Sequence, residues 1–261
     1  MTSTSSISSA ISALPTDVIG NNIFRYLSLP ALAICARVCK AWNKMAQEHI
    51  NAFSHPHAFG PKEWFIYFGA HLKNVPRLPP NIAEIMNSPC PFWPDKKVHE
   101  THLLVLVPQT VSGQPLTLKT LGELTKKRLI GFATRFSSCN LGEYTDPAAP
   151  PSHWVLMTRD VIEGSRNKSY QTQQALLNQK AGGSYEVPTI LDATVCIFME
   201  YVRTWTLLYS RNRVTYTYTR CQEKYDAHWQ LVVGGFASDG LDVCYSRYDG
   251  ENLGVGGSRK F

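Results

Sequence analysis

The sequence lacks any apolar run approaching the ~20 residues that a helix needs to cross a bilayer, so no membrane-spanning segment is expected. Its first residues, 1–12, contain no lysine or arginine and no hydrophobic stretch, which argues against a Sec-type signal peptide. Lysine and arginine are scattered elsewhere, without the aromatic-interleaved basic stripe of a nucleic-acid groove. The chain shows no internal repeat, which excludes leucine-rich-repeat and propeller receptors.

The chain also lacks a cysteine framework. Its seven cysteines are an odd number without the spacing of a disulfide scaffold, which indicates free thiols in a reducing, cytoplasmic compartment. The net charge of +6 is a mild excess, and 44% hydrophobic with 18% charged residues is typical of a globular protein. A length of 261 residues fits one small module followed by one domain of average size.

The N-terminal part predicts a tail and three short helices. Residues 1–12 are rich in serine and threonine and are expected to be disordered. Over residues 13–54, Pro15 suits the first turn of one helix, Ser28 is a plausible N-cap for a second, and Trp42 lies on the apolar side of a third. A module of ~40 residues is near the lower limit for independent folding. Its surplus apolar surface must therefore be covered by another protein or by the rest of the chain.

The apolar residues of this module follow an ordered pattern, with an opening Leu-Pro, a central Ile-Phe and a closing Val-Cys-Lys-x-Trp. The residues that carry the pattern are Leu14, Pro15, Val18, Ile23, Phe24, Leu27, Leu29, Leu32, Val38, Cys39 and Trp42. The pattern resembles an F-box and covers roughly Ala13 to Phe53. The resemblance implies that these residues bind a Skp-type adaptor and so dock the chain onto a cullin-RING ubiquitin ligase. The alternative is a three-helix cap that packs on the chain's own C-terminal domain.

Residues 55–261 predict a mixed α+β domain with a mainly antiparallel sheet. Residues 55–61 are rich in turn-forming residues and indicate a link. The predicted helices are 63–68, 81–86, 116–127, 169–179 and 188–205. Ala175 and Leu176 are expected to face inward in the fourth helix, and the fifth is expected to bury one stripe. Residues 88–94 predict a rigid loop that packs Phe92 and Trp93. The predicted strands are 102–107, 153–158, 214–221, 229–236 and 241–246.

This second half resembles the C-terminal part that accompanies F-box-like segments in a protein family of chlamydia-related intracellular bacteria. The residues that carry the resemblance lie in the segments 87–93, 101–105, 152–161, 218–223 and 232–237. The resemblance implies no known chemistry for the domain, but it implies a bacterial effector that acts on the ubiquitin machinery of a host cell. The serine- and threonine-rich start is similar in composition to type III export signals.

Several residues could carry chemistry in principle. A cysteine hydrolase could be assembled from Cys90 or Cys139, His102 or His153, and Asp160, although no nucleophile signature surrounds either cysteine. Such a hydrolase, delivered by the F-box, is the alternative to an adaptor.

The sequence also contains candidates for a metal site, a cofactor site and a recognition loop. Cys35 and Cys39 are one helical turn apart but lack a second pair at zinc-finger spacing, so no metal is expected. Residues 254–258 are too short for a dinucleotide fingerprint and are expected to end a strand, so no cofactor is expected. The polar residues Arg159, Asp160, Arg166, Asn167 and Lys168 form either a recognition loop or a plain surface turn.

The sequence therefore predicts a non-catalytic substrate-recognition adaptor. The F-box-like module would bind the Skp-type adaptor and, through it, a cullin. Residues 55–261 would present a target protein. Ubiquitin transfer would be carried out by other subunits of the ligase, so no catalytic residue is assigned in this chain.

Overall fold

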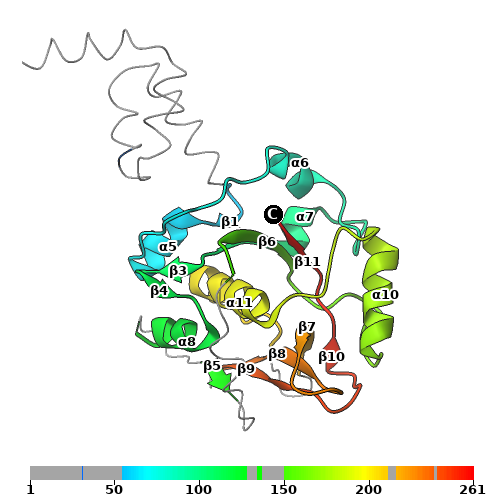
Figure 1. Cartoon of the computed structure of the whole chain (residues 1–261). Helices are drawn as coiled ribbons and strands as arrows, with labels where there is room; N and C mark the ends of the chain where they lie inside the picture. Colours follow the sequence, from blue (N-terminus) through cyan, green and yellow to red (C-terminus); the bar gives the residue numbers. More distant parts are fainter. Residues whose placement is uncertain (1–30, 32–54, 128–133, 137–149, 211–215, 238–239) are drawn as a thin grey trace, which may run out of the picture. The chain divides into compact units, whose positions relative to one another are not determined.

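Figure 1 shows the computed structural model of the chain, which describes residues 31, 55–127, 134–136, 150–210, 216–237 and 240–261. The chain divides into two units, Met1–His55 and Pro56–Phe261. Apart from Ala31 and His55, all described residues belong to the second unit. The tail and the three helices expected over residues 1–54 lie outside the described residues, except for Ala31.

One sheet of the second unit has the strand order β1-β2-β6-β11. Its strands are β1 (Ala58–Phe59), β2 (His102–Val107), β6 (His153–Thr158) and β11 (Ser258–Lys260). β1 runs parallel to β2, and the other pairs are antiparallel. β2 and β6 have the bounds that their apolar runs predict, and every residue of β2 is buried.

A second sheet has the order β10-β7-β8-β9-β5. It consists of β10 (Leu253–Gly254), β7 (Tyr218–Lys224), β8 (Gln230–Ala237), β9 (Gly240–Tyr245) and β5 (Thr134–Phe136). The three long strands are antiparallel, and the short strands β10 and β5 pair in parallel at the two edges. The prediction of an α+β unit with mainly antiparallel pairing is confirmed for the described residues, although the strands form two larger sheets and not one.

Helix α11 (Ile190–Thr204) lies in the centre of this unit (Figure 1). It contacts β2 and β6 of the first sheet and β7 and β8 of the second. Residues Ile190 to Val202 are consequently all buried. The helix itself is confirmed, but the expectation of a single buried stripe is wrong. An amphipathic pattern describes a helix that covers one surface, whereas α11 is covered on more than one side.

The remaining helices surround this centre. They are α5 (Pro61–Phe68), α6 (Ile82–Asn87), α7 (Val98–Thr101), α8 (Leu118–Lys127) and α10 (Tyr170–Ala181). All but the single-turn α7 were expected within a few residues. A small hairpin pairs β3 (Thr110–Val111) with β4 (Gln114–Pro115). The loop at 88–94 buries Phe92 as predicted, and Trp93 packs half-buried against the core.

Two local expectations for this unit are wrong. Residues 55–61 are not a simple link, because Ala58 and Phe59 pair with Leu104 and Val105 and Phe59 is 1% exposed. A two-residue strand is too short to show a periodicity. In α10, Ala175 is exposed, contrary to the prediction, whereas Leu176 is partly buried against the core; the fully buried residues are Gln173 and Leu177. Gln173 can be buried although it is polar, because its Nε2 donates a hydrogen bond to the carbonyl of Ser165.

The glycine-rich segment 254–258 ends β10, as expected, and then leads directly into β11 of the other sheet. Its backbone is packed closely: a Cβ at Gly254 would lie 2.7 Å from the Cβ of Val161. The amide of Gly256 donates to Thr219 Oγ1 at 2.8 Å, and that of Gly257 donates to Thr158 Oγ1 at 3.1 Å. Glycine is therefore used here for close approach between the sheets, and not for a phosphate loop.

Candidate functional site

The residues predicted to bind the Skp-type adaptor all lie outside the described residues. They are Leu14, Pro15, Val18, Ile23, Phe24, Leu27, Leu29, Leu32, Val38, Cys39 and Trp42. The zinc candidates Cys35 and Cys39 and the hydrolase candidate Cys139 lie outside them as well. Their roles remain predictions. The geometry of a site is accessible only in the second unit.

Cys90 and His102 are both sealed in the core. Cys90 is 1% exposed, and its sulfur accepts the amide hydrogen of Phe92 at 3.4 Å. His102 is 2% exposed, and its Nδ1 lies 2.9 Å from the hydroxyl of Thr101. Burial lowers the pKa of His102 to about 4. A closed environment of this kind suits a packed core and gives a substrate no access.

The second candidate histidine, His153, forms an ion pair with Asp192 and not with Asp160. Its Nε2 lies 2.9 Å from Asp192 Oδ1, and its Nδ1 lies 2.8 Å from the carbonyl of Pro151. Burial alone would lower the pKa of His153, but the hydrogen bond and charge of Asp192 raise it above its ordinary value. Asp160 instead accepts the amide of Val161 at 2.7 Å. The described residues do not assemble the hydrolase arrangement.

Asp192 carries this charge cluster. Its carboxylate is 1% exposed, and Lys260 Nζ lies 3.0 Å from its second oxygen. Burial would raise the pKa of Asp192, but the hydrogen bond from His153 and the charge of Lys260 lower it below its ordinary value. Because Asp192 is in the first turn of α11, the cluster connects that helix to β6 and β11. Both nitrogens of His153 face acceptors, which favours the doubly protonated ring.

The polar residues at 159–168 do not form one cluster. Arg159 Nη1 forms an ion pair with Glu200 Oε1 at 2.7 Å, whereas Arg166 donates to the carbonyl of Glu251 at 2.9 Å. Asn167 adopts a left-handed turn conformation with φ of 53°, and the carbonyl of Lys168 accepts from Arg220. These residues therefore do not form one patch, and the interpretation of the segment as a single recognition loop is wrong. Its last residue, Lys168, directly precedes Ser169, which lines a pocket.

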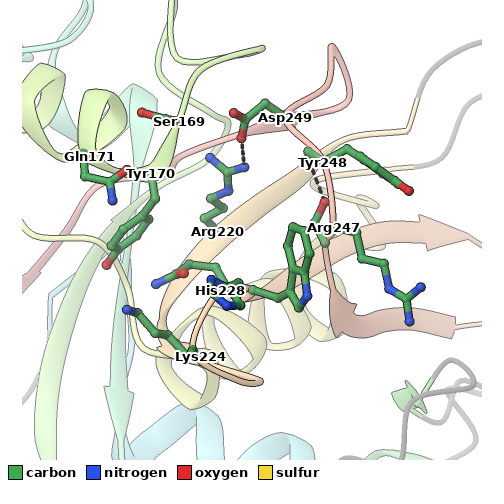
Figure 2. Close-up of a pocket in the computed structure, with 13 residues that line it drawn as sticks. Ser169, Tyr170, Gln171, Arg220, Lys224, His228, Arg247, Tyr248 and Asp249 are labelled. Atoms are coloured by element: carbon green, nitrogen blue, oxygen red, sulfur yellow. Dashed lines mark hydrogen bonds and ion pairs between the residues drawn. The ribbon is translucent and has the colours of Figure 1, made fainter.

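That pocket lies between the start of α10, the β7–β8 hairpin and the loop after β9, and we call it the hairpin pocket (Figure 2). It encloses ≈ 320 Å³, which is at the lower end of the range of about 300–1,000 Å³ for ligand sites. Its lining consists of Ser169, Tyr170, Gln171, Arg220, Lys224, Ala227, His228, Trp229, Gln230, Ser246, Arg247, Tyr248 and Asp249.

Arg220 is the most deeply buried charge of the hairpin pocket, at 5% exposure. One end of its guanidinium donates to the carbonyl of Lys168 at 2.7 Å and to Gln173 Oε1 at 3.1 Å. The other end pairs with Asp249, as Figure 2 shows. Its charge and most of its donors are used within the protein. Arg220 therefore positions α10 and the 246–249 loop, and does not present a vacant guanidinium.

Other donors of the hairpin pocket are not used in this way. Gln230 is 6% exposed, and its Nε2 has no hydrogen-bond partner among the described residues. Lys224 has no carboxylate within ion-pair distance in the part of the chain that the structure describes. The nearby carboxylate of Asp226 accepts the backbone amides of His228 and Trp229 at 2.7 and 2.9 Å. The pocket is thus rich in donors, while its nearby carboxylates are already engaged.

The N-terminus of α10 adds to this character. Ser169, Tyr170 and Gln171, where the helix begins, line the pocket. The first amide groups of a helix have no partner within it and carry a partial positive charge. Ser169 satisfies one of them, by accepting the amide of Thr172 at 3.3 Å. The remaining dipole favours an acceptor or an anion in the pocket.

The Ser169 cap can be tested by itself. We expect Ser169→Ala to lower the free energy of unfolding by ~1 kcal/mol, because the Thr172 amide loses its acceptor. Urea unfolding, monitored by tryptophan fluorescence, measures the change in the free energy of unfolding. Ser169→Asp retains an acceptor and is the matched control, expected to unfold within ~0.5 kcal/mol of the parent. An alanine variant as stable as the parent would contradict the capping role.

Sequence reasoning did not identify the residues of this pocket. Several come from places where the predicted elements begin or do not reach: Trp229 begins the predicted strand 229–236, whereas Lys224 lies between the predicted strands and in fact ends β7. The available signal was the polar segment between two apolar strands, since loops at the edge of a sheet often carry binding residues. That signal does not reveal the partner segments at 169–171 and 246–249.

Residues 11–52 match the F-box-like family model. The match supports an F-box protein and covers the segment in which the ordered apolar pattern occurs. A comparison with curated proteins and with solved structures gives no significant match. The bacterial family suggested for the second half therefore remains a prediction. Within the described residues, no group of three or more His, Cys, Asp or Glu side chains could hold a metal ion.

In the part of the chain that the structure describes, no helix combines the length and the apolar character that a bilayer span requires.

Proposed function

We propose that this protein is a substrate-recruiting adaptor of an SCF-type ubiquitin ligase. The observation that carries the proposal is the F-box-like match at residues 11–52. F-box segments bind Skp-type adaptors, and through them a cullin, so the N-terminal unit would attach the chain to the ligase. Pro56–Phe261 would hold the target protein.

The mechanism is proximity. A tethered target meets the charged conjugating enzyme at a high effective concentration, and no chemical step is required of this chain. Cys90 and His102 are buried and His153 pairs with Asp192, so these described candidates do not support the alternative of a cysteine hydrolase. The hairpin pocket is the candidate surface for a target, because it is the polar cavity whose donors are not all satisfied by described residues.

We further propose that the protein works in the cytosol of a host cell after export by a bacterium. This part of the proposal is supported by the resemblance of the segments 87–93, 101–105 and 152–161 to the chlamydia-related family, and by the composition of residues 1–12. A reporter enzyme fused after residue 12 and expressed in a bacterium with a type III system tests it. Secretion that requires the system supports export, and retention of the reporter contradicts it.

The adaptor role predicts a specific loss of binding. Leu14→Ala combined with Pro15→Ala should weaken capture of a purified Skp-type adaptor at least ~30-fold, because alanine replacement of interface anchors typically costs ~2 kcal/mol or more. Biolayer interferometry with the full chain measures the affinity. The predicted contacts of the remaining apolar residues, from Val18 to Trp42, would give graded losses in single alanine variants.

The controls separate docking from folding. Ser8→Ala with Ser9→Ala is a matched double substitution outside residues 11–52 and should bind the adaptor like the parent. Both double variants should show the parent's thermal unfolding of the second unit. Equal adaptor binding by the Leu14, Pro15 variant and the parent would refute the adaptor proposal.

A further inference from the structure

The hairpin pocket has three separate features that favour a negatively charged ligand. The first is the positive end of α10, where Ser169, Tyr170 and Gln171 line the cavity. The second is the buried Gln230 amide, whose Nε2 lacks a partner among the described residues. The third is the positive charge of Lys224. These features come from different segments of the chain and converge on one cavity.

The Gln230 amide is the most informative of the three. A buried donor without an acceptor costs free energy in the ligand-free protein, and native proteins rarely retain one without a reason. An acceptor that enters the hairpin pocket would remove that cost. Tyr170 lines the same cavity and places a second polar group there. Burial raises the pKa of Tyr170 and the Gln230 side chain lowers it in part, but no hydrogen bond of acceptable geometry joins Tyr170 to Gln230 Nε2. The site therefore selects an oxygen acceptor over an apolar group.

Charge narrows the ligand class further. Among the described residues, neither Asp249, which is paired with Arg220, nor Asp226, which accepts two backbone amides, forms an ion pair with Lys224. Figure 2 shows Lys224 and Tyr170 on one side of the view and Tyr248 on the other. The Arg247 guanidinium is directed away from the Arg220–Asp249 pair (Figure 2) and donates to the hydroxyl of Tyr245 at 2.8 Å. Lys224 is then the principal counter-charge for a bound oxyanion.

The dimensions and surroundings favour a peptide side chain as the source of that oxyanion. A volume of ≈ 320 Å³ holds a few side chains, not a folded domain. Tyr248, 79% exposed, and the half-buried Trp229 flank the cavity and can pack against neighbouring residues of an extended segment. A nucleic-acid groove would need a track of cations along several phosphates, which this single cavity does not supply.

We propose that the hairpin pocket binds an acidic peptide segment by one oxyanion, a carboxylate or a phosphoryl group, that accepts from Gln230 and from the amides at the start of α10 and pairs with Lys224. As the target-binding site of the adaptor, this assignment rests on the proposed function. The binding itself does not require an adaptor, so the two can be tested apart.

The test uses the full chain and fluorescein-labelled decapeptides in fluorescence anisotropy at low salt. The probes are deca-glutamate, an alternating phosphoserine–glycine decapeptide, and deca-glutamine as the neutral control. At least one anionic peptide should bind about tenfold or more tightly than deca-glutamine. The comparison of the two anionic probes identifies the source of the oxyanion.

Variants place the binding in the pocket. Lys224→Glu should weaken the preferred peptide about tenfold or more, because a charge-assisted contact is replaced by repulsion. Lys62→Glu makes the same charge change on an exposed residue of α5 outside the pocket and should have little effect. Gln230→Leu should weaken binding several-fold while thermal unfolding stays at or above the parent's temperature, because the variant removes an unsatisfied donor.

Three results would overturn the assignment. Equal affinity for the anionic and neutral peptides would show that the pocket does not recognise an oxyanion. Equal losses in the Lys224 and Lys62 variants would indicate non-specific attraction. Tighter binding of a ten-nucleotide single-stranded DNA, abolished by Lys224→Glu, would assign the pocket to nucleic acid. None of these assays contains a Skp-type adaptor, so failure here leaves the adaptor test at Leu14 and Pro15 unaffected.

Discussion

Replacing His153 with leucine and Lys260 with methionine in one chain is expected to lower the free energy of unfolding by about 3–5 kcal/mol at pH 7. The two substitutions remove both basic side chains that face Asp192, whose nitrogens lie 2.9 and 3.0 Å from its carboxylate oxygens. The carboxylate is 1% exposed and cannot regain water without a rearrangement of α11. A buried charge that has lost its partners is among the most destabilising changes a protein can undergo.

The pH dependence of this effect gives a sharper test. In the parent, the pKa of Asp192 is lowered, so its contribution is present above the unfolded value of about 3.9 and is lost as the pH falls through the folded pKa. In the double variant, burial without cations should raise that pKa. Stability would then be lost as the pH rises through the folded pKa. The difference between parent and variant should therefore shrink as the pH falls from 7 to 4.

His153 contributes with the opposite sign. Its pKa is raised in the folded parent, so its contribution is complete below the unfolded value of about 6.5 and is lost as the pH rises through the folded pKa. The ion pair is therefore strongest between the ordinary pKa values of the two groups. Urea unfolding at pH 4, 5, 6 and 7 measures the whole profile.

A third substitution provides the control. Adding Asp192→Leu to the double variant removes the stranded charge and should restore most of the lost stability, because apolar groups can replace a buried ion pair at little cost. A double variant that loses less than ~1 kcal/mol at pH 7 would contradict the account. So would a triple variant no more stable than the double.

Elements with a strong local signal could be predicted from the sequence. The continuous apolar run at 102–107 gives β2, and the long periodic segment at 188–205 gives α11. Each contains enough consecutive apolar residues to determine its type. The strand β1, by contrast, has only Ala58 and Phe59. Its existence depends on pairing with β2, which lies more than 40 residues along the chain, and no local pattern records that pairing.

The F-box-like character of the N-terminal segment could be predicted for a different reason. Its residues form an ordered pattern within one short segment, and the family model matches the same segment, residues 11–52. The hairpin pocket has no such pattern. Arg220 meets Gln173 and Asp249 across separations of 47 and 29 residues, so the site exists only after the second sheet and α10 have formed. The sequence likewise does not indicate that the Gln230 amide is buried in a pocket, because Gln230 simply lies at the start of a predicted strand.

Replacing Arg220 with methionine should lower the free energy of unfolding by about 3 kcal/mol. Methionine keeps much of the volume, but Gln173 Oε1 and the Lys168 carbonyl lose their donor. Gln173 is completely buried, and a buried acceptor left without a donor costs about 1–3 kcal/mol. Urea unfolding of the full chain, followed by the fluorescence of Trp229 and the other tryptophans, measures the loss.

Arg220→Lys distinguishes geometry from charge. Lysine keeps the charge opposite Asp249, but a single ammonium cannot reproduce a planar fork that holds three acceptors in fixed directions. We expect a loss between that of methionine and zero, about 1–2 kcal/mol. Asp249→Asn should cost less than ~1 kcal/mol, because Asp249 is half-exposed and water can replace its role. Equal losses for the lysine and asparagine variants would show that the ion pair, and not the fork, holds the pocket together. A methionine variant as stable as the parent would show that α10 and the 246–249 loop keep their places without Arg220.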